Sequence, residues 1–255
     1  MYYTIKKFVS FLACFSTFLA QAFCFPNEET NGSDFSFANW KKNNIFASAH
    51  FNLAEYFNCL WQKHPEYIKI IHIRDLRDVC VSCTFFQSEE IEKEIGTSCF
   101  AEKLLFVLSL ENKPCNYILR IKKYAEIAAE WIKDPLAVVC RFENLIGEKG
   151  GGSLISQQEQ ITAIAKSLNI NLDRSKLDWI TDNLFGIRSG PSLPSTYREG
   201  KIGSWRKFFN AEHKKAFEEH LGEIQLHLGY DLFDDEKNFL ANPANDNLLI
   251  WKKGK

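Results

Sequence analysis

The feature that most constrains the fold of this chain is a short apolar segment, residues 68–73, that stops abruptly in charge. Four of its six residues are isoleucines, which favour a β-strand. Four charged residues then precede a second apolar segment that starts at Val79: Arg74, Asp75, Arg77 and Asp78. A buried parallel strand that leads through a charged loop into a helix is the usual framework of a phosphate site, because free backbone N–H groups and the helix dipole favour an anion there. The pattern predicts Arg74 at the carboxyl end of the strand and Ser82 in the first turn of the helix, where both can reach one phosphate.

The length and charge of the chain limit the kinds of function it can have. With 255 residues, 45 % of them hydrophobic and 25 % charged, the chain can bury one sizeable core or at most two small ones, and we expect one globular domain. The formal net charge of −1 excludes a general binder of polyanions, so a nucleic acid partner is not expected. Any phosphate chemistry is therefore local to one site.

Residues 1–22 differ from the rest of the chain. Lys6 and Lys7 precede a long apolar run, and Ala20 and Ala22 are small residues of the kind that a signal peptidase requires. The pattern predicts a cleavable signal peptide, and with it a secreted or exported protein without a membrane span after cleavage. An uncleaved membrane anchor is an alternative, although the run is shorter than the roughly 20 residues that cross a bilayer. A buried core strand or helix is another alternative.

The cysteines do not predict a disulfide framework. Cleavage after Ala22 would leave an odd set without repeated spacing: Cys24, Cys59, Cys80, Cys83, Cys99, Cys115 and Cys140. Cys80 and Cys83 form a C-x-x-C at a predicted helix start, where a thiolate would be stabilised. Because no second pair or nearby histidine completes a zinc site, we favour small residues on a buried helix face.

The next part of the chain predicts alternating strands and helices. Residues 23–44 are polar and indicate a linker or an N-terminal arm, and a short strand is expected at 45–47. Helical patterns cover 88–133, and a second buried strand at 136–140 again ends in charge. Two strands that end in this way, separated by helices, predict an α/β fold with a parallel sheet and a site at its carboxyl edge.

The later part predicts helices joined by two glycine-rich segments. Residues 150–152 form a glycine turn before a helix capped by Ser153, and the turn lacks the P-loop pattern, so we assign it no phosphate role. A further helix is expected at 173–184, followed by a long basic loop at 186–204. The last helix carries histidines seven residues apart, too far apart to share a metal and more typical of a solvated stripe: His213, His220 and His227. Residues 234–255 are expected to be a C-terminal extension.

Three motifs occur in the order and spacing of one enzyme family. They are IHIRDLRDVCVS at 71–82, VVCRFENLIGEKGGGS at 138–153 and STYREGKIGSWRKFF at 195–209. Over roughly residues 45–233 the chain resembles the sulfotransferases that use 3′-phosphoadenosine 5′-phosphosulfate. The resemblance implies a three-layer fold of the P-loop-NTPase-like kind, with helices on both faces of a parallel sheet. It also implies that no metal takes part. The residues that it implies for binding the 3′-phosphate of the cofactor are Arg74, Ser82, Arg198, Glu199 and Gly200.

The resemblance also implies a catalytic residue. His50, in the segment SAHFNL, is similar in place to the family histidine that acts as base toward the acceptor hydroxyl. Sulfuryl transfer to an alcohol needs a base within hydrogen-bond reach of the acceptor proton, and histidine is tuned near neutral pH. Taken alone, a single histidine after a small-residue turn is more often structural, and the resemblance makes the two interpretations about equal.

One element of the family pattern is missing from the sequence. Family members begin with a strand and a P-K/R-S-G-T-T loop that holds the 5′-phosphosulfate, and residues 1–49 contain no such loop. Lys41 and Lys42 lie near this place, but without the glycine and hydroxyl residues that let a backbone approach phosphate. Loss of the phosphosulfate loop is expected to affect catalysis more than nucleotide binding. Loss of the strand before it would open a gap in the sheet, unless the apolar N-terminal run fills that gap.

Two functions of different classes therefore stay open. The first is an active sulfotransferase that moves a sulfuryl group to a small-molecule, glycan or protein acceptor, with a hydroxyl or an amine as the accepting group. The second is a catalytically degenerate, exported protein of the same fold that binds the desulfated nucleotide or a protein partner. A gene fragment or a mis-set start is a third interpretation, and a different start would make the protein cytoplasmic.

Overall fold

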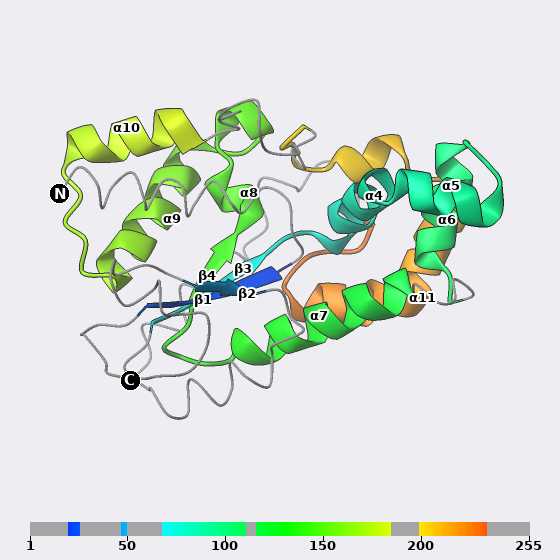
Figure 1. Ribbon diagram of the computed structural model, residues 1–255. Coiled ribbons are helices and arrows are strands. Elements are labelled where there is room, and N and C mark those ends of the chain that lie inside the picture. Colours follow the sequence, from blue (N-terminus) through cyan, green and yellow to red (C-terminus); the bar gives the residue numbers. More distant parts are fainter. Residues whose placement is uncertain (1–19, 26–46, 50–67, 111–115, 185–198, 234–255) are drawn as a thin grey trace. The chain divides into compact units, whose positions relative to one another are not determined.

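The computed structural model describes residues 20–25, 47–49, 68–110, 116–184 and 199–233, drawn in colour in Figure 1. The chain folds into α-helices and one small sheet, which confirms the α/β class. It forms two compact units, each built from two stretches of the sequence. The first unit comprises Met1–Arg74 and Leu136–Ile202, and the second comprises Asp75–Pro135 and Gly203–Lys255.

The sheet of the first unit has four strands in the order β2-β1-β3-β4. Their bounds are Ala20–Phe25 for β1, Ala47–Ala49 for β2, Ile68–Ile73 for β3 and Val138–Arg141 for β4. β3 and β4 pair in parallel, as the two strand-then-charge patterns predict. β1 pairs antiparallel with both β2 and β3, so the prediction of a purely parallel sheet is wrong for that half.

β1 bears on the predicted signal peptide. Ala20–Ala22, the last residues of that predicted segment, pair with Ile71–Ile73 of β3. The end of the apolar N-terminal run thus supplies a strand beside β3. Cleavage after Ala22 stays a prediction, and it would remove half of the six paired positions of β1.

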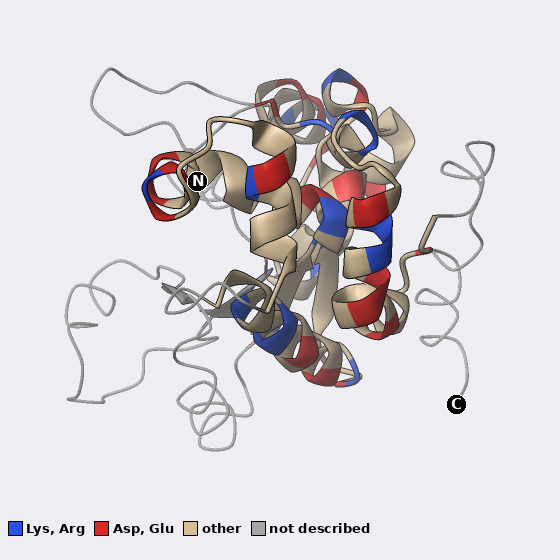
Figure 2. Cartoon of the chain, turned by 90° about the vertical axis from the view of Figure 1, so that its right-hand side faces the viewer, with Lys and Arg blue, Asp and Glu red and all other residues tan. Residues whose placement is uncertain are grey.

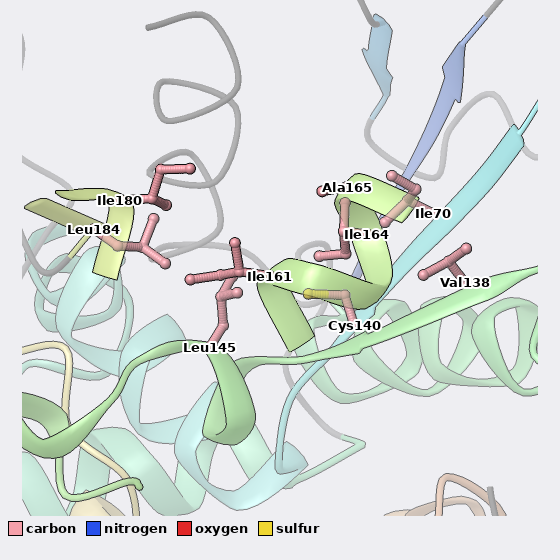
Figure 3. Packing of buried hydrophobic residues seen from close by; sticks show 9 residues of the cluster. All are labelled: Ile70, Val138, Cys140, Leu145, Ile161, Ile164, Ala165, Ile180 and Leu184. Carbon is pink, nitrogen blue, oxygen red and sulfur yellow. The ribbon is translucent and has the colours of Figure 1, made fainter. Parts of the chain in front are cut away.

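Helices pack on the sheet residues of the first unit and close its core. They are α8 (Phe142–Leu145), α9 (Leu154–Ser167) and α10 (Arg174–Leu184), with a 3₁₀ turn at Glu148–Gly150. Ser153 caps α9 by accepting a hydrogen bond from the amide of Ser156, as predicted. Figure 3 shows aliphatic side chains of α9 and α10 converging with side chains from β3, β4 and α8. The cluster consists of Ile70, Val138, Cys140, Leu145, Ile161, Ile164, Ala165, Ile180 and Leu184.

The described part of the second unit is helical. Its helices are α4 (Leu76–Phe86), α5 (Ser88–Ile95), α6 (Phe100–Leu108), α7 (Tyr117–Trp131) and α11 (Ala211–His227), with the 3₁₀ turn η4 at Ser204–Lys207. The helical pattern predicted for 88–110 is split into two helices, because Gly96 adopts a left-handed conformation with φ 70° and ends α5. One face of α7 packs inward: Ile118, Ile121, Ala128 and Trp131 are buried, and Tyr124 and Ile127 are half-buried.

One prediction about α11 is wrong. His213 does not belong to a solvated stripe, because its side chain is only 1 % exposed. Its Nδ1 accepts from the amide of Asn210, and its Nε2 lies 2.8 Å from the carbonyl oxygen of Ala101. This histidine therefore caps α11 and ties it to α6.

The charges of the described helices are mixed. Figure 2 shows acidic and basic residues following one another along the same helices. This agrees with the near-zero net charge of the sequence. Within the described ranges, every helix is too short or too polar to cross a bilayer.

Candidate functional site

Arg74 follows the last residue of β3 and lies in the interior of the first unit. Its side chain is 7 % exposed. Its Nη2 donates a hydrogen bond to the carbonyl oxygen of Lys201 at 3.2 Å. Its guanidinium carbon lies 4.0 Å from the centre of the Phe142 ring, within the range of a cation–π contact.

The sheet register accounts for the contact between Arg74 and Phe142. Ile73 of β3 pairs with Arg141 of β4, so the two parallel strands end side by side. Arg74 and Phe142 are the next residues of the two strands, and they therefore leave the same sheet edge together. The two predicted strands, each followed by charged residues, thus end next to each other at the carboxyl edge of the sheet. This is the edge at which the sequence predicts the site.

The segment Glu199–Ile202 lies against this edge and belongs to the same unit. Gly200 is buried and has a φ of 59°, a conformation that glycine adopts without a steric cost. The amide of Ile202 donates to the carbonyl oxygen of Gly150 at 2.9 Å. We call the motif at 195–209 the late motif. The structure brings Arg74 together with the Gly200–Lys201 part of the late motif, although Lys201 follows Arg74 by 127 positions in the sequence.

Of the six predicted site residues, two lie outside the described residues, and the other four, Arg74 and Gly200 among them, lie inside. His50 and Arg198 belong to the first group. Glu199 is half-buried next to Gly200. Ser82 is half-buried and belongs to the second unit.

The predicted position of Ser82 on its helix needs a correction. We expected the first turn, but α4 begins at Leu76, which places Ser82 in the second turn. The helix starts earlier because Asp75 caps it, with a side-chain oxygen that accepts from the amide of Arg77 at 2.9 Å. The charged residues at 77 and 78 are therefore helical and do not form a loop.

In the second unit, the start of α4 is held by a buried ion pair. Nη2 of Arg77 lies 2.7 Å from Oδ2 of Asp75, and its Nε contacts both carboxylate oxygens. The guanidinium carbon of Arg77 lies 4.2 Å from the centre of the Trp205 ring. Gln225 of α11 donates to Asp75 and accepts from the amide of Leu76. These contacts fix the first turn of α4 inside this unit.

Asp78 joins α4 to the end of the late motif. One carboxylate oxygen accepts from the amide of Gly203 at 2.8 Å, and the other accepts from the amide of Trp205 at 2.9 Å. Asp78 is 1 % exposed, so both hydrogen bonds are shielded from water. Gly203 and Trp205 are motif residues, and this carboxylate fixes their backbone.

His72 is buried in β3, two residues before Arg74. Burial, and secondly the positive charge of Arg74, lower its pKa from 6.5 to about 3. The imidazole is therefore neutral at physiological pH. Its ring meets Phe142 edge-on, with the ring centres 6.4 Å apart.

The C-x-x-C pair of α4 behaves as the favoured interpretation predicts. Both thiols are free. Burial raises the pKa of Cys83 to about 12, although the charge of Arg120 opposes this shift, and burial also raises the pKa of Cys80. Neither thiol is activated. Among the described residues, no group of three or more His, Cys, Asp or Glu side chains is arranged to ligate a metal ion.

Sequence reasoning missed two partners of Arg74. Phe142 was visible only as part of the RFENL segment, and Lys201 only as a variable position inside the late motif. The parallel register of β3 and β4 would have paired Arg74 with Phe142, had the end of each strand been known to one residue. The contact with Lys201 depends on a long-range approach of backbone that leaves no residue pattern.

Comparison of the chain with protein-family models, with curated proteins and with solved structures gives no match.

Proposed function

We propose that this protein binds the 3′-phosphate of 3′-phosphoadenosine 5′-phosphosulfate, or of its desulfated product, in the manner of a sulfotransferase. The residues of the first unit proposed to hold the phosphate are Arg74, Arg198, Glu199 and Gly200. A contribution of Ser82, which belongs to the second unit, stays a prediction from the sequence motif. The larger fold proposed with this function is the three-layer sulfotransferase fold with β1 in place of its first strand. No metal takes part in the proposed site.

One observation carries the proposal: the hydrogen bond from Arg74 to the carbonyl oxygen of Lys201. Arg74 belongs to the motif at 71–82, and Lys201 belongs to the motif at 195–209. A contact between the guanidinium of one motif and the backbone of the other supports a common role. Arginine suits this role because its planar donors match phosphate geometry.

The mixed charges of the helices also support a local anion site. Arg74 places one buried positive charge at the carboxyl edge of the sheet. In the described part of the chain, acidic and basic residues follow one another along the helices (Figure 2). Such a protein would select a small phosphorylated ligand over a polyanion.

Calorimetry with 3′-phosphoadenosine 5′-phosphate tests the proposal. The wild type should bind it, and should bind adenosine 5′-phosphate, which lacks the 3′-phosphate, at least about tenfold more weakly. In Arg74→Ala this preference should disappear. Arg174→Ala, which removes an exposed arginine paired with Asp178, is the matched control and should bind as the wild type does. Absence of binding by the intact wild type would overturn the proposal.

Sulfuryl transfer is the second step of the proposal and depends on His50. If His50 is the base toward an acceptor hydroxyl, transfer of labelled sulfate should be lost in His50→Ala while nucleotide binding is retained. Binding without transfer in the wild type would instead support the degenerate, nucleotide-binding form. The acceptor class stays a proposal: a small-molecule, glycan or protein hydroxyl, or an amine.

A further inference from the structure

The glycine-rich turn after α8 is built from backbone alone. Within it, the amides of Gly150 and Gly152 both donate to the carbonyl oxygen of Gly147, at 3.1 and 2.8 Å. Gly147 and Gly151 have φ values of 68° and 90°, which favour glycine. The turn is therefore tight, and the carbonyl oxygen of Gly150 is available to a segment outside it.

Gly150 lies against the late motif of the same unit. Its carbonyl oxygen accepts from the amide of Ile202 at 2.9 Å. A Cβ atom added at Gly150 would lie 2.7 Å from the carbonyl oxygen of Gly200, and 2.3 Å from a side-chain carbon of Ile146. The backbone of 200–202 thus packs directly on the turn, at a distance that no side chain permits.

The peptide group between Lys201 and Ile202 is held at both ends. Its N–H donates to Gly150, and its carbonyl oxygen accepts from Nη2 of Arg74 at 3.2 Å. A donor on one side and an acceptor on the other polarise the same peptide in the same direction, which strengthens both hydrogen bonds. The orientation of this peptide, and with it the place of the Arg74 guanidinium, depends on Gly150.

From these contacts we infer that Gly150 is a positioning residue for the proposed 3′-phosphate site. It acts through the Lys201–Ile202 peptide and does not touch the ligand. The inference rests on the proposed function, and it gives the glycine turn a role that the sequence pattern did not assign. It follows that any side chain at position 150 would displace Gly200 and turn the shared peptide away from Arg74.

The test compares Gly150→Ala with Gly151→Ala. A Cβ at Gly151 would have no atom within 4 Å, so this control strains the same turn without touching Gly200. Gly150→Ala should weaken binding of 3′-phosphoadenosine 5′-phosphate about tenfold and remove its advantage over adenosine 5′-phosphate. Gly151→Ala should keep that advantage. An equal loss in both variants would overturn the inference, since turn strain alone would then explain it.

A second measurement needs no nucleotide. Amide hydrogen exchange at Ile202 should be about tenfold faster in Gly150→Ala, and also faster in Arg74→Ala, because both residues hold the same peptide. Unchanged exchange in Gly150→Ala would contradict the inference. If the wild type binds no nucleotide but Ile202 responds as expected, the proposed function fails while the link from Gly150 to Arg74 stands.

The new methyl group in Gly150→Ala would also clash with Ile146, and this clash alone can unfold the variant. A double variant separates the two effects. Ile146→Ala with Gly150→Ala removes the isoleucine side-chain atoms near the new methyl group and leaves the contact with Gly200. Compared with Ile146→Ala alone, the double variant should still lose the preference for the 3′-phosphate. Retention of the preference in the double variant would overturn the inference.

Discussion

Arg74 and Arg77 are three residues apart and both buried, but their surroundings differ. Arg77 forms a forked ion pair with Asp75, in the same turn of chain. Arg74 stacks on Phe142 and donates to the carbonyl oxygen of Lys201, which are far from it in sequence. Arg77 thus completes a local helix start, whereas Arg74 joins segments that the motifs predict to form one site. We therefore expect substitution of Arg77 to affect stability, and substitution of Arg74 to affect binding.

The largest expected effect on stability is that of Arg77→Ala. Removal of this guanidinium would leave the carboxylate of Asp75 buried without its ion partner, which typically costs about 3–5 kcal/mol. The free energy of unfolding from urea titration measures the change. Arg74→Ala should lose less, about 2–3 kcal/mol, since its hydrogen bond to Lys201 and its contact with the Phe142 ring are each weaker than a buried ion pair. Equal losses in the two variants would contradict the comparison.

A second prediction concerns Asp78, the buried carboxylate in the first turn of α4, and extends the comparison to a residue that holds the end of the late motif. In Asp78→Ala the amides of Gly203 and Trp205 would lose their buried acceptor, at a cost of about 2–4 kcal/mol in the free energy of unfolding. Asp78→Asn keeps one acceptor oxygen of similar shape, so its loss should be about half as large. Urea midpoints measure both. If Asp78→Ala unfolds at the wild-type midpoint, this carboxylate does not hold the end of the late motif.

A third prediction concerns the stability of the protein at acidic pH, which depends on His72 and on the charge of Arg74 beside it. Unfolded histidine binds a proton below pH 6.5, whereas folded His72 does so only near pH 3. Between these values the unfolded state binds the extra proton, so stability should fall as pH falls, by at most about 1.4 kcal/mol per pH unit. Urea titrations at pH 7, 6 and 5 measure this slope.

Two variants separate the causes of this acid sensitivity. His72→Leu removes the titrating group and should flatten the slope. Arg74→Ala removes the second cause of the lowered pKa, so the loss of stability should end at a higher pH than in the wild type. A wild-type slope that persists in His72→Leu would show that other groups produce it.

The sequence predicted the elements that local patterns determine. Apolar runs that end in charge identified β3 and β4, and helical spacing identified α9, α10 and α11, with Ser153 as a cap. The parallel pairing followed from the helices between the strands. Arg74 was placed correctly at the end of its strand, because a buried apolar run has a clear boundary with charge.

The parts that sequence reasoning missed depend on competition between local signals or on distant partners. Any of the charged residues at 74–78 could have preceded the first residue of α4, and the sequence does not show which one caps the helix. Because Asp75 is the cap, α4 begins at Leu76 and Ser82 lies in its second turn. His213 looked solvated in its own helix, but its partner Ala101 is 112 residues away. An apolar run with small residues at its end fits a signal peptide and a strand equally well, so pairing of β1 with β3 was not decidable from it.

The smallest predicted effect concerns β1, which pairs with the strand that carries Arg74. A chain that starts at Phe23 lacks the β1 residues that pair with Ile71–Ile73. Loss of these hydrogen bonds should lower the free energy of unfolding by about 1–3 kcal/mol. A chain that starts at Leu19 keeps all six pairs and serves as the matched control in urea titration. Because the contacts of Arg74 depend on where β3 ends, the shorter chain should also bind 3′-phosphoadenosine 5′-phosphate more weakly. Equal stability of the two chains would show that β1 does not support this edge, and would leave cleavage after Ala22 without a structural cost.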